Sequence, residues 1–178
     1  MKRVVFVVGH SFYDNGADNK NTGDTEYKFN MEVAHWIMQN EKFKDIDTII
    51  KARNASYGEL PEEINSLNPD LVVCLHCNAF NEKVQGTEML YWYNSKKGKA
   101  AAEIFQNHFL EALKLNNRKA QGKKHKENGA PVLSGTKAVC IIGEPFFIDS
   151  MDLIDDALVE KVGRAYLDSV KEVFEKVI

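Results

Sequence analysis

The sequence predicts one α/β domain, residues 1–178, with a mostly parallel or mixed central sheet of about five or six strands and helices on both faces. Its length of 178 residues suits a single compact domain. Its composition, with 44% hydrophobic and 28% charged residues, is close to the average for soluble globular proteins. Short apolar runs alternate with segments of helical periodicity, and this alternation is typical of an α/β sheet.

Five segments are expected to form the strands of this sheet. Residues 3–8, 48–52, 71–77 and 138–142 are continuous apolar runs, as expected of strands that are covered on both faces. Residues 86–93 are rich in Thr, Tyr and Trp and begin with a glycine, which predicts a further strand that flanks the sheet.

The segments between these runs predict the helices and one long loop. An apolar stripe begins at Glu26 and continues through Phe29 and Val33 to Ile37, and residues 98–113 and 155–177 repeat apolar residues at spacings of three and four. Pro61 is expected to open a short helix over residues 62–67. Residues 116–130 contain glycine, asparagine and lysine without apolar periodicity, and we expect a loop there.

Charge and composition exclude several classes of protein. Twenty-three Lys and Arg against 26 Asp and Glu give a net charge of −3, which provides no overall field for a nucleic acid. No apolar run approaches the ~18 residues of a membrane span. Three cysteines fit a reducing compartment, and the N-terminus lacks the features of a signal peptide, so we expect synthesis in the cytoplasm.

Three predicted strands end close to a residue that can bind metal or transfer protons. His10 follows the first run, His76 follows residues 71–75, and Glu144 follows residues 138–142. Ligands of open α/β sheets bind outside the carboxyl ends of the strands, so these side chains are expected to converge. A single histidine after a strand is more often a packing or turn residue, and the convergence of three such ends is the informative feature.

Glu26 is expected to join this group because it begins the apolar stripe of its helix and so faces inward. Taken alone it would be an ordinary carboxylate at a helix N-terminus, where the macrodipole favours it. Two imidazoles and one carboxylate are, however, a known catalytic zinc set that leaves a fourth position for water. The sequence therefore predicts Zn²⁺ bound by His10, Glu26 and His76, with Glu144 free to act as the base.

The cysteines and the remaining histidines are weaker candidates. Alternation along a strand places Cys74 and Cys77 on opposite faces, so the three cysteines are interpreted as small core residues, the third being Cys140. His35 lies about half a turn round the helix from Glu26 and is expected at the solvated surface, whereas His108 is expected to pack.

A basic run lies inside the predicted loop. It contains Arg118, Lys119, Lys123, Lys124 and Lys126, with His125 among them and no acid before Glu127. Two interpretations stay open: an ordinary solvated run, or a rim that contacts an anionic substrate. Elsewhere the chain lacks the dinucleotide fingerprint, the P-loop, the serine-hydrolase elbow and the paired histidines of zincins.

The ordered motifs resemble the catalytic domain of zinc-dependent N-acetylmuramoyl-L-alanine amidases, the cell-wall hydrolases of bacteria and phage lysins. They are Gly9-His10 after the first strand, Asp14-Asn15-Gly16-Ala17, Glu26 on the first helix, Leu75-His76-Cys77-Asn78-Ala79, Gly86-Thr87-Glu88 and Gly143-Glu144-Pro145-Phe146-Phe147-Ile148. The chain departs from the family at Leu75 and Cys77, which flank His76, and at Asp149-Ser150. These departures leave the four predicted site residues intact.

The resemblance implies hydrolysis of the amide bond between N-acetylmuramic acid and L-alanine in peptidoglycan. It matches His10, Glu26 and His76 to the zinc ligands and Glu144 to the catalytic glutamate. It also implies action on the cell wall after release or assisted export. One alternative is a zinc peptidase or another amidohydrolase with a different substrate, and an alternative of another class is a non-catalytic peptidoglycan-binding module.

Overall fold

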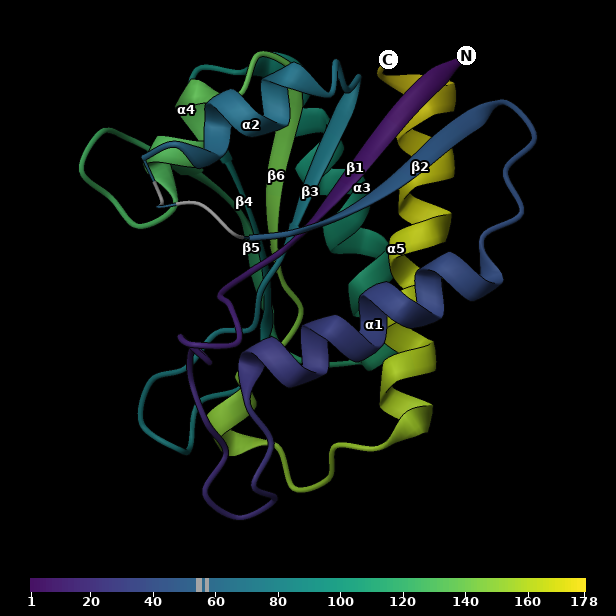
Figure 1. The fold of residues 1–178 in the computed structure, drawn as a ribbon. Helices are drawn as coiled ribbons and strands as arrows, with labels where there is room; N and C mark the ends of the chain where they lie inside the picture. The colour runs from purple at the N-terminus through teal and green to yellow at the C-terminus, as the bar shows by residue number, and fades with distance from the viewer. Residues whose placement is uncertain (54–55, 57) are drawn as a thin grey trace.

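A six-stranded sheet forms the centre of the computed structural model, which describes residues 1–53, 56 and 58–178 (Figure 1). In chain order the strands are β1 (Lys2–Val8), β2 (Ile46–Ala52), β3 (Leu71–Leu75), β4 (Thr87–Trp92), β5 (Asn117–Lys123) and β6 (Val139–Glu144). Their order across the sheet is β2-β1-β3-β6-β4-β5. The predicted fold class, an α/β domain with a central sheet, is confirmed.

The sheet is mixed, and its directions decide which strand ends meet. β1 is parallel to β2 and β3, and β3 is parallel to β6. β4 runs antiparallel to β6 and parallel to its other neighbour, β5. The carboxyl ends of β1, β3 and β6 therefore lie next to one another at one edge of the sheet, where His10, His76 and Glu144 are found.

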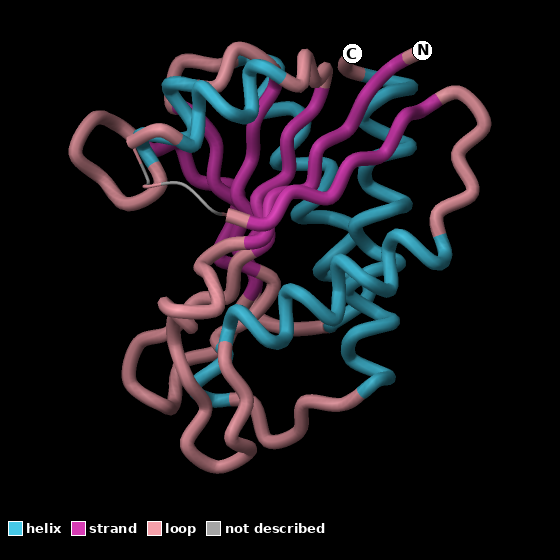
Figure 2. Tube along the Cα trace, in the orientation of Figure 1, coloured by secondary structure: helices cyan, strands magenta, loops and turns pink. Residues whose placement is uncertain are grey.

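Helices cover both faces of the sheet, as predicted (Figures 1 and 2). The long helices α1 (Glu26–Asn40), α3 (Lys96–Leu113) and α5 (Asp156–Lys176) pack on one face, and the short helices α2 (Leu60–Ser66) and α4 (Ala130–Gly135) pack on the other. A 3₁₀ turn, Ile148–Ser150, follows β6. Among the described residues, no helix is both long and apolar enough to cross a membrane.

Two hydrophobic clusters separate the layers. The larger lies under the long helices and includes Phe6, Phe29, Phe105, Phe146 and Tyr166. The smaller lies under α2 and α4 and contains the alternate β1 side chains Val5 and Val7. Strands β1 and β3 therefore bury both faces, which explains why their sequences are continuous apolar runs.

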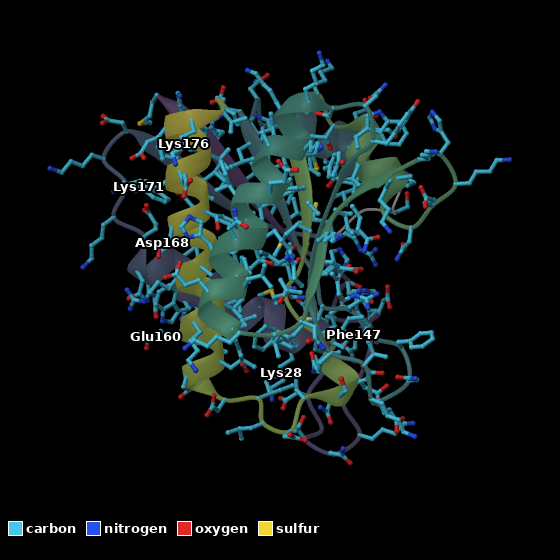
Figure 3. All side chains as sticks on the ribbon, turned by 180° about the vertical axis from the view of Figure 1, so that it is seen from behind. Lys28, Phe147, Glu160, Asp168, Lys171 and Lys176 are labelled. Carbon is cyan, nitrogen blue, oxygen red and sulfur yellow. The ribbon has the colours of Figure 1, made fainter. Side chains whose placement is uncertain are left out.

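The outer face of α5 is charged, in keeping with its amphipathic sequence. Glu160, Asp168, Lys171 and Lys176 are exposed along it (Figure 3), while apolar residues such as Val162 and Val170 are buried. This face lies on the long-helix side of the sheet.

The prediction of a loop over residues 116–130 is wrong, because β5 occupies Asn117–Lys123 and α4 begins at Ala130. None of the side chains of β5 is fully buried, so no apolar alternation marks the strand in the sequence. Its backbone pairs with β4 at the edge of the sheet, and it is this pairing that makes it a strand.

Two strand ends also differ from the prediction. β3 stops at Leu75, so His76 and Cys77 lie beyond the strand, where they had been expected within it. β6 extends to Glu144, so this residue is the last of its strand and not a residue of the following loop. The main-chain N–H of His76 still donates to the carbonyl oxygen of Gly143 at 3.1 Å, which keeps these two ends together.

Candidate metal centre

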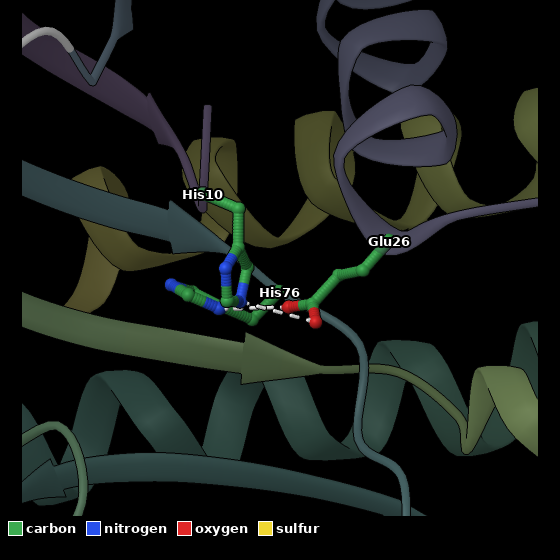
Figure 4. A group of neighbouring side chains, drawn as sticks. All are labelled: His10, Glu26 and His76. Atoms are coloured by element: carbon green, nitrogen blue, oxygen red, sulfur yellow. Dashed lines mark hydrogen bonds and ion pairs between the residues drawn. The ribbon is translucent and has the colours of Figure 1, made fainter. Parts of the chain in front are cut away.

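His10, Glu26 and His76 reach one point from three different elements (Figure 4). His10 lies two residues after β1, in a left-handed conformation with φ of 64°. His76 follows β3 directly, and the last residues of these paired strands, Val8 and Leu75, are register partners. Glu26 is the first residue of α1, which the side chain of Thr25 caps by accepting a hydrogen bond from the main-chain N–H of Lys28.

The three side chains are within contact distance of one another. Nε2 of His10 lies 3.2 Å from Oε2 of Glu26, and Nδ1 of His76 lies 2.9 Å from Oε1 of the same carboxylate. One candidate ligand atom from each of the three residues lies within 4.8 Å of the others. The imidazole rings have their centroids 5.3 Å apart and meet edge to face. The structure therefore brings together the three residues that the sequence analysis grouped.

Glu26 is a buried carboxylate that its surroundings keep ionised. Its exposed fraction is 3%, and the main-chain N–H groups of Cys77 and Ala17 donate to its oxygens at 3.0 and 3.3 Å. Burial by itself raises the pKa of Glu26, but the hydrogen bonds to His10 and His76 and their charges outweigh it and hold the pKa below its ordinary value. The hydrogen bond to Glu26 in turn raises the pKa of His10, against the opposing effect of burial. The carboxylate is thus placed to share a cation with both imidazoles.

This set of donors fits Zn²⁺. Zinc binds imidazole nitrogen and carboxylate oxygen at about 2.0–2.2 Å, and ligands at neighbouring corners of a tetrahedron then lie roughly 3.3 Å apart. His10 and His76 contact different oxygens of Glu26, and one donor atom from each residue lies within 4.8 Å of the others, which is close enough for all three to bind one ion. Three protein donors leave a fourth position for water or substrate, which is the arrangement of catalytic zinc sites.

A second carboxylate orients His10. Oδ2 of Asp14 lies 3.3 Å from Nδ1 of His10 and accepts a hydrogen bond from Nη2 of Arg53 at 2.8 Å. Hydrogen bonding to His10 is the main cause that lowers the pKa of Asp14. An outer carboxylate of this kind fixes which ring nitrogen faces the metal, and here it leaves Nε2 toward Glu26. In the sequence Asp14 is recognisable only as part of a turn, because its contact with Arg53 spans 39 residues.

Two glycines provide the space in which the three side chains meet. A Cβ atom added to Gly9 would lie 2.5 Å from Cε1 of His76, and one added to Gly16 would lie 2.6 Å from Oε2 of Glu26. Gly16 also has a φ of +71°, which favours glycine. Both positions appear in the sequence motifs, but their contacts with the site residues are visible only in the structure.

Glu144 lies in the same cavity as the candidate metal ligands. It ends β6, is 8% exposed, and its Oε2 is buried without a hydrogen-bond partner among the described residues. Burial is the main cause that raises the pKa of Glu144, and the nearby charges of Glu26 and Glu88 add to it. The cavity has a volume of about 250 Å³. It is lined by His10, Ala17, Glu26, His76, Cys77, Asn78, Ala79, Leu90, Asn128, Gly129, Ile142 and Glu144.

A hydrogen-bonded network around the buried Glu88, next to Glu144, was not found from the sequence. Glu88 on β4 is the register partner of Glu144, and its Oε1 accepts a hydrogen bond from Nδ2 of Asn78 at 2.7 Å. Its Oε2 accepts from Nε of Arg118 at 2.8 Å, and the Arg118 guanidinium also lies over the ring of Phe147 at 4.9 Å. Arg118 therefore compensates the buried carboxylate of Glu88, although its own side chain is 39% exposed.

The other residues of the basic run border the cavity less directly. Lys123 ends β5, and its charge acts on Glu144 by lowering the pKa of that carboxyl. Lys124 and Lys126 are exposed in the segment that leads to Asn128 and Gly129, which line the cavity. The position of this segment favours the interpretation as a rim.

The weaker candidates lie outside the centre. All three cysteines are free and buried, with Cys74 and Cys140 in the smaller cluster and Cys77 in the larger one, so their interpretation as core residues on opposite faces is confirmed. His35 is exposed and contacts Gln39, as expected. His108 is partly buried and pairs with Glu172 at 2.7 Å, while His125 packs on the ring of Trp92.

Comparison with known proteins gives a consistent result. The family model described as N-acetylmuramoyl-L-alanine amidase matches residues 4–172. The fold is similar to that of an N-acetylmuramoyl-L-alanine amidase from Clostridium difficile 630, with a TM-score of 0.87 at 19% identity over 98% of both chains. No curated protein sequence matches the chain.

Two further solved structures extend the comparison. Cwp6 from Clostridium difficile is 26% identical with a TM-score of 0.86, over 97% of this chain and 29% of Cwp6. The catalytic domain of the CD27L endolysin, which targets Clostridia difficile, is 24% identical with a TM-score of 0.79, over 100% of this chain and 99% of that domain.

Proposed function

Because the chain belongs to the N-acetylmuramoyl-L-alanine amidase family, enzymes that cleave peptidoglycan, we propose that it performs this hydrolysis with Zn²⁺ bound by His10, Glu26 and His76 and with Glu144 as the general base. The bond concerned joins the lactyl group of N-acetylmuramic acid to L-alanine of the stem peptide. Since the substrate is the wall polymer, we infer that the protein acts at the cell wall.

One observation supports this assignment above the others. Two imidazoles and a carboxylate meet in the same cavity as a buried carboxyl oxygen that has no partner among the described residues. The first three offer the donors that zinc prefers. The unpartnered oxygen of Glu144 costs free energy in the folded protein, and such a cost is common at sites where the group has a catalytic task.

Different residues of the chain have different roles in the proposed reaction. When bound, Zn²⁺ supplies a lowered pKa for water and polarises the scissile carbonyl. His10, Glu26 and His76 hold the ion, and Asp14 keeps the His10 ring in its orientation. Glu144 accepts a proton from the attacking water and passes it to the nitrogen of L-alanine as the amide bond breaks. The raised pKa of Glu144 suits this role, because the carboxyl must hold the proton between the two transfers.

The alternatives make different demands on the site. A non-catalytic wall-binding module has no need of a buried unpaired carboxyl beside three metal-binding side chains. A zinc peptidase would use the same residues on a different bond, and an assay for new L-alanine amino groups on purified wall separates it from an amidase.

The test is the variant Glu144→Gln. We expect it to retain zinc and the melting temperature of the parent but to lose about 10²- to 10⁴-fold in the rate of wall hydrolysis, because the amide cannot accept the proton. Zinc content, thermal melting and hydrolysis are measured on one preparation. Glu103→Gln is the matched control, since Glu103 is exposed on α3, and it should behave as the parent.

Two outcomes would contradict the proposal. Loss of zinc from Glu144→Gln would make Glu144 a ligand. Retention of zinc together with a normal rate would assign the base to another residue.

A further inference from the structure

We propose that Phe12 and Tyr13 form a stacking platform for the sugar rings of the glycan strand, on the β1 side of the cavity. This inference rests on the proposed function, because it assigns the two halves of the peptidoglycan substrate to opposite sides of the same cavity. The two residues follow the candidate ligand His10 in the chain, and the proposed reaction has no other use for them.

The two aromatic side chains occupy the tip of a tight turn. The main-chain N–H of Ser11 donates to the carbonyl oxygen of Asp14 at 2.9 Å, and the reverse bond is 3.0 Å, so Phe12 and Tyr13 are the two tip residues. Their exposed fractions are 74% and 95%. Their rings meet edge to face, with centroids 5.4 Å apart. Two neighbouring aromatic rings at such exposure are unfavourable in water and are typical of a binding surface.

The turn is fixed to the metal site. Asp14, which closes the turn, contacts Nδ1 of His10 and accepts a hydrogen bond from Arg53 beyond the end of β2. The tip is therefore tied to a candidate ligand on one side and to a neighbouring strand on the other. A surface held in this way loses little conformational entropy when a ligand binds, which favours its use in recognition.

The opposite side of the cavity has a different chemistry. There Lys123 ends β5, and the segment after it carries Lys124 and Lys126 and brings Asn128 to the cavity wall. β1 and β5 are four strand spacings apart in the sheet order, or roughly 19 Å at about 4.8 Å per strand. Because β5 runs antiparallel to β1, its carboxyl end lies at the other edge of the sheet, and the segment after it returns to the cavity at Asn128 and Gly129. In Figure 1 the purple segment after β1 and the green segment after β5 leave the sheet in different directions.

The bond to be cleaved joins a charged stem peptide to an uncharged glycan, and the two sides of the cavity differ in the same respect. The stem peptide carries carboxylates, which the lysine side attracts. The glycan presents the C–H faces of pyranose rings, and these pack on aromatic rings because the ring face carries partial negative charge. A glycan on Phe12 and Tyr13, with the peptide toward the segment that contains Asn128, places the joining amide over the cavity that His10, His76 and Glu144 line.

Binding of an uncharged sugar chain tests the platform directly. The probe is chitohexaose, which has the pyranose backbone without lactyl groups or peptide, and its affinity is measured by calorimetry on zinc-loaded Glu144→Gln protein. In this background, Phe12→Leu with Tyr13→Leu should lose about tenfold in affinity, since leucine keeps the apolar character but has no ring face. Phe12→Trp with Tyr13→Trp should keep the affinity.

A matched control separates the platform from the basic side. Lys123→Gln, Lys124→Gln and Lys126→Gln together should leave chitohexaose affinity unchanged, because the probe has no charge. The inference is overturned if the leucine variant binds as tightly as the parent, if the lysine variant loses as much, or if the parent shows no measurable binding.

A second measurement, wall hydrolysis by protein that keeps Glu144, distinguishes failure of the platform from failure of the proposed function. The leucine variant should keep its zinc content and hydrolyse purified wall about tenfold more slowly at low wall concentration. An equal rate would overturn the platform while leaving the amidase assignment intact. Absence of hydrolysis by the parent would overturn the proposed function, whatever the chitohexaose result.

Discussion

Gly16 illustrates how a residue without a side chain controls the candidate metal site. A Cβ atom there would lie 2.6 Å from Oε2 of Glu26 and 2.7 Å from Cδ2 of His10. We therefore predict that Gly16→Ala lowers zinc affinity by about 10- to 100-fold, the usual cost of disturbing the residues that position metal ligands. Competition with a chelator of known affinity measures the change.

Gly23 provides the control for backbone strain. Its φ of +78° is close to the +71° of Gly16, but no atom of the described residues lies within 4 Å of a Cβ atom built on it. Gly23→Ala should therefore suffer the same left-handed strain, roughly 1–2 kcal/mol of stability, and keep its zinc affinity. If both variants lost zinc equally, strain and not contact with Glu26 would explain the effect.

The residues that the sequence could identify are those whose position depends on local pattern. Strand ends indicated His10 and His76, and the apolar stripe of α1 indicated Glu26. Asp14 and Glu88 could not be found in this way, because their partners Arg53 and Arg118 lie 39 and 30 residues away. Their roles depend on tertiary contacts, which the spacing of apolar residues in the sequence does not indicate.

At the scale of elements, β5 shows where pattern reading fails. The buried strands β1 and β3 could be recognised because their side chains face apolar layers on both sides. β5 has Arg and Lys at three of its seven positions and pairs with a single neighbour, as is common for protected edge strands. The missed strand matters for function, because the segment that follows it brings Asn128 and Gly129 to the cavity wall.

The next prediction concerns the lysines at the end of β5 and in the segment that leads to α4. Replacing Lys123, Lys124 and Lys126 with glutamine should weaken the binding of Glu144→Gln protein to purified wall several-fold at low salt. The difference from the parent should shrink as salt screens the attraction to carboxylates of the stem peptide. Arg118 is left unchanged because it compensates Glu88. Sedimentation of the protein with wall at several salt concentrations measures the effect.

A second lysine cluster supplies a control of equal charge. Lys42, Lys44 and Lys171 border a shallow pocket between the end of α1 and α5, away from the cavity that contains Glu144. Their replacement with glutamine changes the net charge by the same amount and should leave wall binding nearly unaltered. Equal losses in the two triple variants would indicate a general charge effect and not a rim.

At the scale of the whole molecule, the candidate ligands join elements that are far apart in the chain. His10 follows β1, Glu26 is the first residue of α1 and His76 follows β3. A bound ion would therefore link the ends of two strands and the start of a helix. The unfolded chain does not hold these three side chains together. Zinc should therefore bind the folded state preferentially and stabilise it.

We predict that zinc raises the melting temperature of the metal-free protein. At a free concentration of 100 times Kd the stabilisation is about 2.7 kcal/mol, which for a domain of this size corresponds to roughly 5–10 °C. Glu26→Gln should lose most of this shift, because it removes the charge between the two imidazoles. Glu144→Gln should keep it, because Glu144 is assigned to proton transfer and not to the ion. Scanning calorimetry at fixed free zinc compares the three proteins. An equal shift in Glu26→Gln would show that zinc stabilises the fold from elsewhere, and the metal centre assigned to His10, Glu26 and His76 would then be wrong.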